Sequence, residues 1–163
     1  MKIFEITNSI DHRYIIRKIM IDKKWPAGLI KEIEDEWIMK DPTAGKDAVE
    51  YINNLTLVKP TPVKVPVEKL LQHKDNILQM KNLPQDILYK IKQNHPNSPI
   101  PNNINKNFEK NPNRYDQYSK MDPSTARPSV MVDGAIDFGV GRFTAALVRG
   151  DQHLNVWQLQ ANK

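Results

Sequence analysis

The residues best suited to chemistry stand near the C-terminus, in the stretch GAIDFGVGRFTAALVRGD. Gly139 and Gly141 lie two apart, and Arg142 and an apolar helical pattern follow at once. Glycine permits positive φ and close approach of a ligand, and the first amides of a helix attract anions. Arginine adds a planar, charged fork that matches phosphate or carboxylate. We therefore predict a phosphate- or nucleotide-binding pocket formed by Gly139, Val140, Gly141, Arg142, Phe143 and Thr144.

A plainer interpretation of the same residues stays open. The two glycines would then only permit a tight turn from strand to helix, and Arg142 would be a surface residue. A short Gly-x-Gly is a weak signal, and the spacing does not match a dinucleotide fingerprint, because Thr144 stands where a third glycine is needed. Spacing alone does not separate the two interpretations.

Asp137 and Arg142 are the candidate catalytic residues. Asp137 stands just before the glycines, where it could orient Arg142, hold a metal ion or act as a base. The alternative is a carboxylate that faces solvent from a strand. The four histidines lack the spacing of metal ligands and are expected to be surface or capping residues, so no metal site is predicted.

Residues 95–127 are rich in Asn, Pro and Lys, show no period, and predict a long loop. Basic side chains there could contact a nucleic acid backbone, and tyrosines could stack on bases. The alternative is a polar loop with two anchoring aromatic residues. The candidate nucleic-acid contacts are Arg114, Tyr115, Tyr118, Lys120 and Arg127.

Periodicity predicts the elements that must position these residues. In the N-terminal half we expect a strand at 2–6, an ambiguous segment at 9–21 and an amphipathic helix at 28–40. A short helix should follow, opened by a capping box at Asp47 and Glu50. We then expect an extended proline-rich stretch, a helix that carries Leu70 and Leu71, and a helix capped by Asn82. In the C-terminal part we expect strand 128–132, a turn at Asp133-Gly134, strand 136–138, helix 143–149 closed by Gly150, and strand 154–159.

The composition sets the broad class of protein. The chain has 163 residues, 39% of them hydrophobic, and a net charge of +5. A modest positive excess favours phosphate-bearing partners. The absence of cysteine excludes disulfides, thiolate metal sites and thiol nucleophiles. The sequence has no apolar run of membrane-spanning length, so we expect a cytoplasmic protein that has no contact with a membrane.

The stretch VMVDGAIDFGVGRFTAALVRGDQHLNVWQL resembles the core motif of the ParB/sulfiredoxin-like fold. Gly139 and Arg142 match the Gly-x-x-Arg box of that family, and Ala145-Ala146 match the helix behind it. PVKVPVEKLLQHKDN is similar to the opening of such domains. The resemblance implies an α+β fold with a small mixed sheet and packed helices, and a helical N-terminal extension that matches no relative is expected before it. From its length we expect a single domain over 1–163, with a helix-rich part at 1–56 and a ParB-like core at 57–163 that carries the 95–127 loop.

The resemblance also implies phosphate chemistry, because members bind CTP or ATP at this box and relatives include partition proteins, sulfiredoxins and phage proteins that act on DNA. A nucleoside triphosphate with Mg²⁺ and a nucleotide or DNA phosphate partner are therefore expected. So is a phage or mobile-element origin with action in a bacterial cytoplasm. Val140 replaces the glutamate of partition proteins and the cysteine of sulfiredoxins, which excludes sulfiredoxin chemistry and argues against CTP hydrolysis.

Two hypotheses about function follow. The first is phosphate or nucleotide binding with phosphoryl transfer, DNA modification or phosphodiester cleavage. The second is a non-catalytic module that binds a nucleic acid or a protein, for example a phage-encoded inhibitor of a host system. The sequence does not decide whether the protein is an enzyme, and it does not indicate an oligomeric state.

Overall fold

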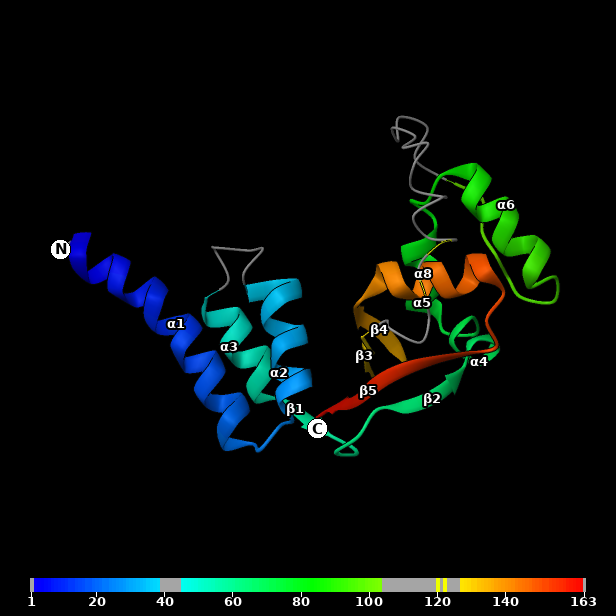
Figure 1. The fold of residues 1–163 in the computed structure, drawn as a ribbon. Helices are drawn as coiled ribbons and strands as arrows, with labels where there is room; N and C mark the ends of the chain where they lie inside the picture. The colour runs from blue at the N-terminus through cyan, green and yellow to red at the C-terminus, as the bar shows by residue number, and fades with distance from the viewer. Residues whose placement is uncertain (1, 39–44, 104–119, 121, 123–126, 163) are drawn as a thin grey trace.

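The structure is a computed structural model, and it describes residues 2–38, 45–103, 120, 122 and 127–162. Over these residues the chain has an α+β fold, in which a mixed five-stranded sheet lies between two groups of helices (Figure 1). The elements in chain order are α1 (Lys2–Asp22), α2 (Ala27–Ile33), the π-helix η1 (Glu34–Ile38), α3 (Lys46–Asn53), β1 (Leu55–Leu57), β2 (Val63–Pro66), α4 (Val67–Leu70), α5 (Lys74–Met80), α6 (Gln85–Asn94), β3 (Ser129–Val132), β4 (Ala135–Phe138), α8 (Val140–Arg149) and β5 (His153–Ala161).

The sheet is assembled on β5, which is the longest of the described strands. β5 pairs in parallel with β3 on one edge. On its other edge it pairs antiparallel with β2 along its first half and with β1 at its C-terminal end. β3 and β4 form an antiparallel hairpin, so the strand order is β1-β5-β3-β4 with β2 also beside β5.

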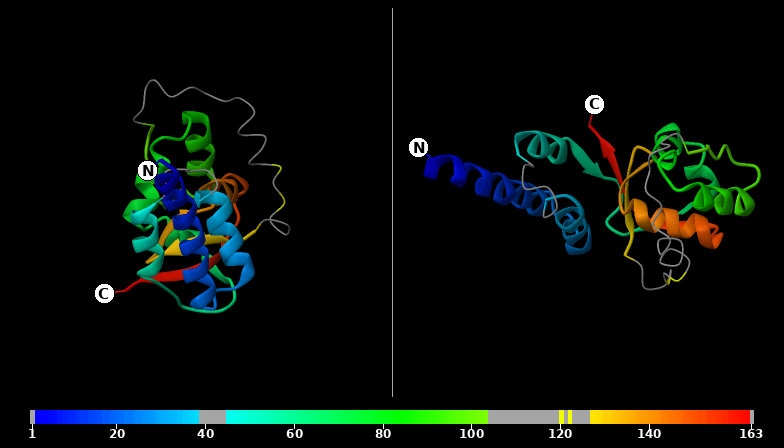
Figure 2. Two further views of the ribbon diagram at one scale, coloured as in Figure 1. Left: turned by 90° about the vertical axis from the view of Figure 1, so that its left-hand side faces the viewer. Right: turned by 90° about the horizontal axis from the view of Figure 1, so that it is seen from above.

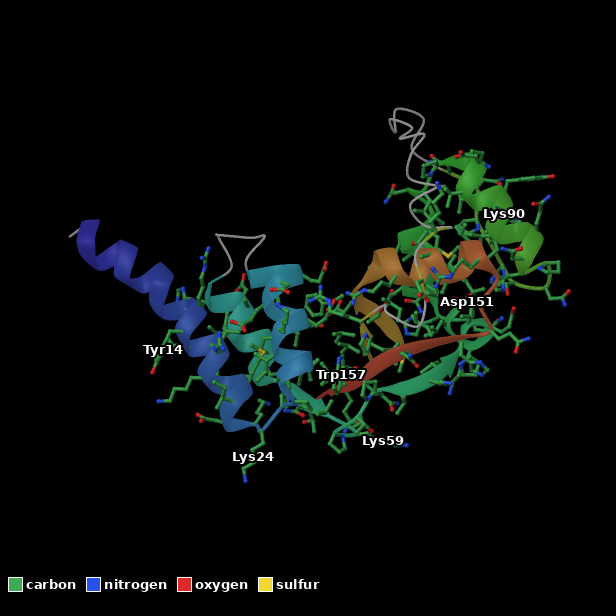
Figure 3. The ribbon with its side chains drawn as sticks, viewed as in Figure 1. Tyr14, Lys24, Lys59, Lys90, Asp151 and Trp157 are labelled. Carbon is green, nitrogen blue, oxygen red and sulfur yellow. The ribbon has the colours of Figure 1, made fainter. Side chains whose placement is uncertain are left out.

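Each face of the sheet covers its own hydrophobic cluster, because successive side chains of a strand point to opposite faces. Val156 of β5 packs into a cluster with residues of α4, α5, α6 and α8. Trp157, its neighbour, packs into a second cluster with residues of α1, α2 and α3. Figure 2 shows these two groups of helices on opposite sides of the sheet. Figure 3 shows Trp157 on the side of α2, where a Cβ added to Gly28 would lie 3.2 Å from the Trp157 ring.

The N-terminal prediction of a strand at 2–6 is wrong, because these residues belong to α1. Alternation over five residues is too short to exclude the start of a helix. The ambiguous segment 9–21 is also helical, and its β-branched residues are tolerated because Ile16 and Met20, one turn apart, are both fully buried against α2 and α3. Among the described residues, no helix combines the length and apolar character that crossing a membrane requires.

Two predicted helix starts need correction. The capping box at Asp47 is wrong, because Gly45 is the N-cap of α3 and Asp47 lies inside its first turn. The prediction that Asn82 caps the next helix is also wrong, because the N-cap of α6 is Pro84. In both cases a neighbour whose backbone favours a non-helical conformation takes the boundary. The helix predicted at 28–40 is present as α2 followed by the π-helix η1, and the end predicted for it at Asp41-Pro42 lies outside the described residues.

The C-terminal elements are confirmed more closely. Asp133 and Gly134 form the hairpin turn with φ of 50° and 91°, which matches the turn type favoured between antiparallel strands. Gly150 ends α8 with φ of 79°. The largest displacement among them is the start of α8, which begins at Val140 rather than at residue 143, because Gly139 takes the N-cap position in the left-handed region.

The outer edge of β4 is covered by side-chain amides of α5. Asn76 Oδ1 accepts a hydrogen bond from the Ile136 amide at 2.8 Å, and Gln79 Nε2 donates to the Ile136 carbonyl at 2.9 Å. Asn76 Nδ2 also donates to the carbonyls of Leu70 and Gly134, at 2.9 and 3.1 Å. Because Asn76 is fully buried, it satisfies three backbone groups that would otherwise lack partners. Such coverage protects an edge strand from pairing with another chain.

Asn76→Ala should therefore be strongly destabilising. Loss of one side chain leaves three buried backbone groups without partners, so we expect the free energy of unfolding to fall by about 3 kcal/mol. Urea denaturation of the full chain measures it. Gln79→Ala is the matched control on the same helix, and because Gln79 is exposed and makes one bond to β4, its cost should stay below about 1 kcal/mol. Equal effects of the two substitutions would contradict this role of Asn76.

Candidate functional site

Gly139 sets the geometry at the start of α8. Its φ of 79° lies in the left-handed region, and it joins the end of β4 to the helix. A Cβ added there would lie 2.7 Å from both Arg142 Nη2 and Ser129 Oγ. Ser129 Oγ in turn donates to the Gly139 carbonyl at 2.9 Å. Glycine is therefore required here both by the backbone conformation and by the close approach of the Arg142 side chain.

Arg142 donates from both terminal nitrogens to the carboxylate of Glu32 in α2. Nη1 lies 3.1 Å from Glu32 Oε2, and Nη2 donates to Oε1. Nη1 also donates to the backbone carbonyl of Arg127 at 2.8 Å. The side chains of Glu32 and Arg142 are only 1% and 12% exposed. The anion that Arg142 binds in this structure is thus supplied by the chain's own N-terminal helices, in the bidentate geometry that arginine uses for carboxylate or phosphate.

Arg127 extends this ion pair into a network. Its Nε lies 3.3 Å from Glu32 Oε2, and its Nη1 lies 2.9 Å from Asp35 Oδ2. Asp35 also pairs with Lys31, one turn earlier, at 3.2 Å. Hydrogen bonds from Arg127 and Lys31 hold the pKa of Asp35 below its ordinary value, and burial lowers the pKa of the Arg142 guanidinium. Arg127, a predicted nucleic-acid contact, is therefore engaged with the same carboxylate as Arg142.

The remaining residues of the predicted phosphate pocket fall into two groups. Val140 and Gly141 are exposed in the first turn of α8, and their amides precede the first intrahelical donors, those of Arg142 and Phe143. Phe143 and Thr144 are buried, with 1% and 3% of their surface exposed. The Thr144 hydroxyl donates to the Val140 carbonyl at 3.0 Å. The structure therefore brings the backbone at Val140 and Gly141 to the surface and turns the next two side chains into the core.

Asp137 has a partner of its own. It is exposed on β4 and accepts a hydrogen bond from the hydroxyl of Tyr51 in α3. Burial raises the pKa of Tyr51, and so do the hydrogen bond to Asp137 and the negative charges of Asp137 and Asp133. Asp137 is hydrogen-bonded to Tyr51 of α3, whereas Arg142 forms an ion pair with Glu32 of α2. The two candidate catalytic residues are therefore held by different N-terminal helices.

The predicted nucleic-acid contacts are only partly described. Lys120 is exposed, and Arg127 lies in the ion-pair network. Arg114, Tyr115 and Tyr118 lie outside the described residues. The structure therefore does not test whether the five residues form one surface.

Within the described part of the chain, no group of three or more His, Asp or Glu side chains is arranged to hold a metal ion. His73 serves as a cap, because its Nδ1 accepts a hydrogen bond from the Asp75 amide at the start of α5, at 3.2 Å. His95 is buried with Nδ1 at 2.9 Å from Glu68 Oε1. The capping role expected for the histidines is confirmed for His73.

Sequence reasoning missed Glu32, the residue that decides the character of this site. The amphipathic pattern assigns it to the polar side of the helix, whereas the structure buries it. A signal was present: Glu32 stands three residues after Leu29 and directly before Ile33, both fully buried, so it lies at the margin of the apolar face. A carboxylate at such a margin needs a buried cation, and Arg142 is that cation.

Comparison of the chain with protein-family models, with curated proteins and with solved structures finds no match. The arguments about function therefore rest on the residues and contacts described above.

The two glycines at this site should respond oppositely to the same substitution. Gly139→Ala should lower the free energy of unfolding by about 2 kcal/mol or more, because alanine is strained at positive φ and its Cβ meets Arg142 and Ser129. Gly141 lies in the first turn of α8 and is not among the glycines with positive φ. Gly141→Ala should therefore raise the free energy of unfolding by about 0.5 kcal/mol. Chemical denaturation of both variants beside the wild type checks the pair. A neutral Gly139→Ala would show that the backbone can relax there.

Proposed function

We propose that the protein is a non-catalytic binding module on a ParB/sulfiredoxin-like core, with Arg142 holding the N-terminal helices against that core. The observation that carries the proposal is the bidentate pair between Arg142 and the buried carboxylate of Glu32. An arginine whose fork is filled by a carboxylate from its own chain acts as a structural group. This is the second of the two hypotheses that the sequence leaves open.

The surroundings of the pair support a structural role. Arg127 adds a second cation to Glu32, so the buried carboxylate has two positively charged partners. Asp137, the candidate base, is bonded to a tyrosine hydroxyl. Phosphoryl transfer requires a cation and a base that converge on the phosphoryl group. Among the described residues, Arg142 and Asp137 are held by different partners and do not converge in this way.

A nucleoside triphosphate with Mg²⁺ does not fit this arrangement. Its phosphates would need the donors of Arg142, and the carboxylate of Glu32 already accepts hydrogen bonds from both terminal nitrogens of that side chain. We therefore derive no step of a reaction through a nucleotide.

Phosphate binding remains the second candidate function, and one observation favours it. Arg142 already holds an anion bidentately beside the exposed first turn of α8, where Val140 and Gly141 lie at the positive end of the helix. If Glu32 withdrew, a phosphate could take the place of its carboxylate. In that case Glu32 would compete with the ligand, and its removal would strengthen binding.

Three variants test the structural role of the Arg142–Glu32 pair. Under the proposed function, Arg142→Ala should cost about 3–5 kcal/mol, because it leaves Glu32 buried without its main partner. The double variant Glu32→Met with Arg142→Met should recover most of that loss, since both charges are gone. Arg17→Ala is the control, because its pair with Glu34 is exposed and should contribute less than about 1 kcal/mol.

A ligand panel completes the test. Thermal shifts of the wild type and of Glu32→Gln would be measured against inorganic phosphate, pyrophosphate, ATP, CTP, GTP and short single- and double-stranded DNA, with and without Mg²⁺. The proposed function predicts no stabilisation of either protein by phosphate, pyrophosphate or a nucleotide, and no gain in DNA binding when the charge of Glu32 is removed. A ligand whose free concentration is a hundred times its Kd would raise the free energy of unfolding by roughly 2.7 kcal/mol. Such a gain, larger in Glu32→Gln than in the wild type, would overturn the proposal in favour of the second candidate.

A further inference from the structure

A pocket of about 400 Å³ opens between η1, α3 and the end of β4. It is lined by Trp37, Asp47, Tyr51, Asp137 and Phe138. Asp47 and Tyr51 are four residues apart on α3, so both lie on one face of that helix. The three aromatic residues are half-buried at the margin of the hydrophobic cluster between the sheet and the N-terminal helices. The pocket is therefore the place where that cluster meets solvent.

The three rings form an angled wall. The Trp37 ring lies 5.6 Å from that of Tyr51 at 82° and 5.8 Å from that of Phe138 at 31°, measured between ring centroids. Rings at such different angles present both faces and edges to the space they enclose. The face of an aromatic ring carries partial negative charge and attracts cations, most strongly for tryptophan. The wall is therefore suited to an alkyl chain that ends in a positive charge.

Two carboxylates complete the pocket. Asp47 and Asp137 are both exposed, and Asp137 is oriented by the Tyr51 hydroxyl. Asp47 and Asp137 are the charged residues among those that line the pocket, so its described lining carries negative charge. This contrasts with the chain as a whole, which has a net charge of +5. A phosphate-bearing partner would be repelled here, whereas a cation would be attracted.

We infer that this pocket binds the side chain of an arginine or lysine residue of a partner protein. The aliphatic stem would lie on the rings of Trp37 and Phe138, and the charged head would reach the carboxylates of Asp47 and Asp137. The pocket opens to solvent, so a partner's backbone can stay outside while one of its side chains enters. Small-molecule sites, in contrast, usually enclose most of their ligand.

This inference goes beyond the proposed function, because it names the chemistry of a partner and rests on residues other than Arg142 and Glu32. The two are also tested apart. A phosphate ligand found in the thermal-shift panel would overturn the proposed function and leave the pocket measurement below unaffected.

The test is an NMR titration of the full ¹⁵N-labelled chain. The probes are N-acetyl-arginine amide, N-acetyl-lysine amide, the neutral N-acetyl-citrulline amide, tetramethylammonium, and a nine-residue Gly/Ser peptide with one central arginine. The signals followed are the Trp37 indole N–H and the amides of Tyr51 and Phe138. Arginine or lysine probes should shift these signals, citrulline amide should bind on the order of tenfold more weakly, and the peptide should bind at least as tightly as the amino-acid amides.

Variants locate the effect. Asp47→Asn combined with Asp137→Asn keeps the shape of both side chains and should weaken binding of the arginine peptide by about tenfold or more. Glu50→Gln is the matched control, since Glu50 is exposed on the same helix and is not among the residues that line the pocket. Its affinity should stay within about twofold of the wild type, as expected for an exposed charge outside the contact.

Each other outcome overturns the inference. Equal binding of arginine and citrulline amides, or an unchanged affinity in the double variant, would show that charge is not recognised. Tighter binding of tetramethylammonium than of the peptide would assign the pocket to a small cation rather than to a protein side chain. Signals that stay fixed with every probe at tens of millimolar would show that the pocket takes no cation.

Discussion

The ion pair between Arg142 and Glu32 is the contact on which the arrangement of the molecule depends. It is almost completely withdrawn from water, and it joins the first turn of α8 to the helix on the opposite side of the sheet. A buried pair adds little net stability compared with apolar side chains, but a single member left alone is costly. The pair therefore acts mainly as a constraint on position: α2 cannot shift along the sheet without stranding a buried charge.

The same ion pair shows what the box formed by Gly139 and Arg142 binds in this structure. Left-handed Gly139 and the fork of Arg142 together form a geometry that recognises an anion, whatever its source. Here the anion is a carboxylate that arrives with the N-terminal helices. These helices supply the partners of both candidate catalytic residues, since Tyr51 of α3 bonds to Asp137 as Glu32 of α2 bonds to Arg142. The N-terminal part therefore determines the chemistry available at the box.

The sequence predicted the fold best where the decisive signals are local. Asp133-Gly134 and Gly150 specify their turn and helix end through their own backbone preferences, and the strands around them were found within two residues of their bounds. The site was predicted only in its backbone. Glu32 is separated from Arg142 by 110 positions, and the carboxylate's burial depends on packing that no local window contains. The aromatic pocket was missed for the same reason, because its rings come from η1, α3 and β4.

The pairing of β5 also orders the events of folding. Within the described sheet, β1 and β2 are both held by β5, and β1 meets it across about a hundred residues, as in the pairing of Leu55 with Ala161. Contacts between such distant residues require a large loss of chain entropy before their packing and hydrogen bonds can offset it. β1 and β2 therefore precede their partner strand by about a hundred residues in the chain, whereas β3 and β4 are joined by a local turn and can pair without β5. Because β5 contributes side chains to both hydrophobic clusters, the two helical layers acquire a common surface to pack against when β5 joins the sheet.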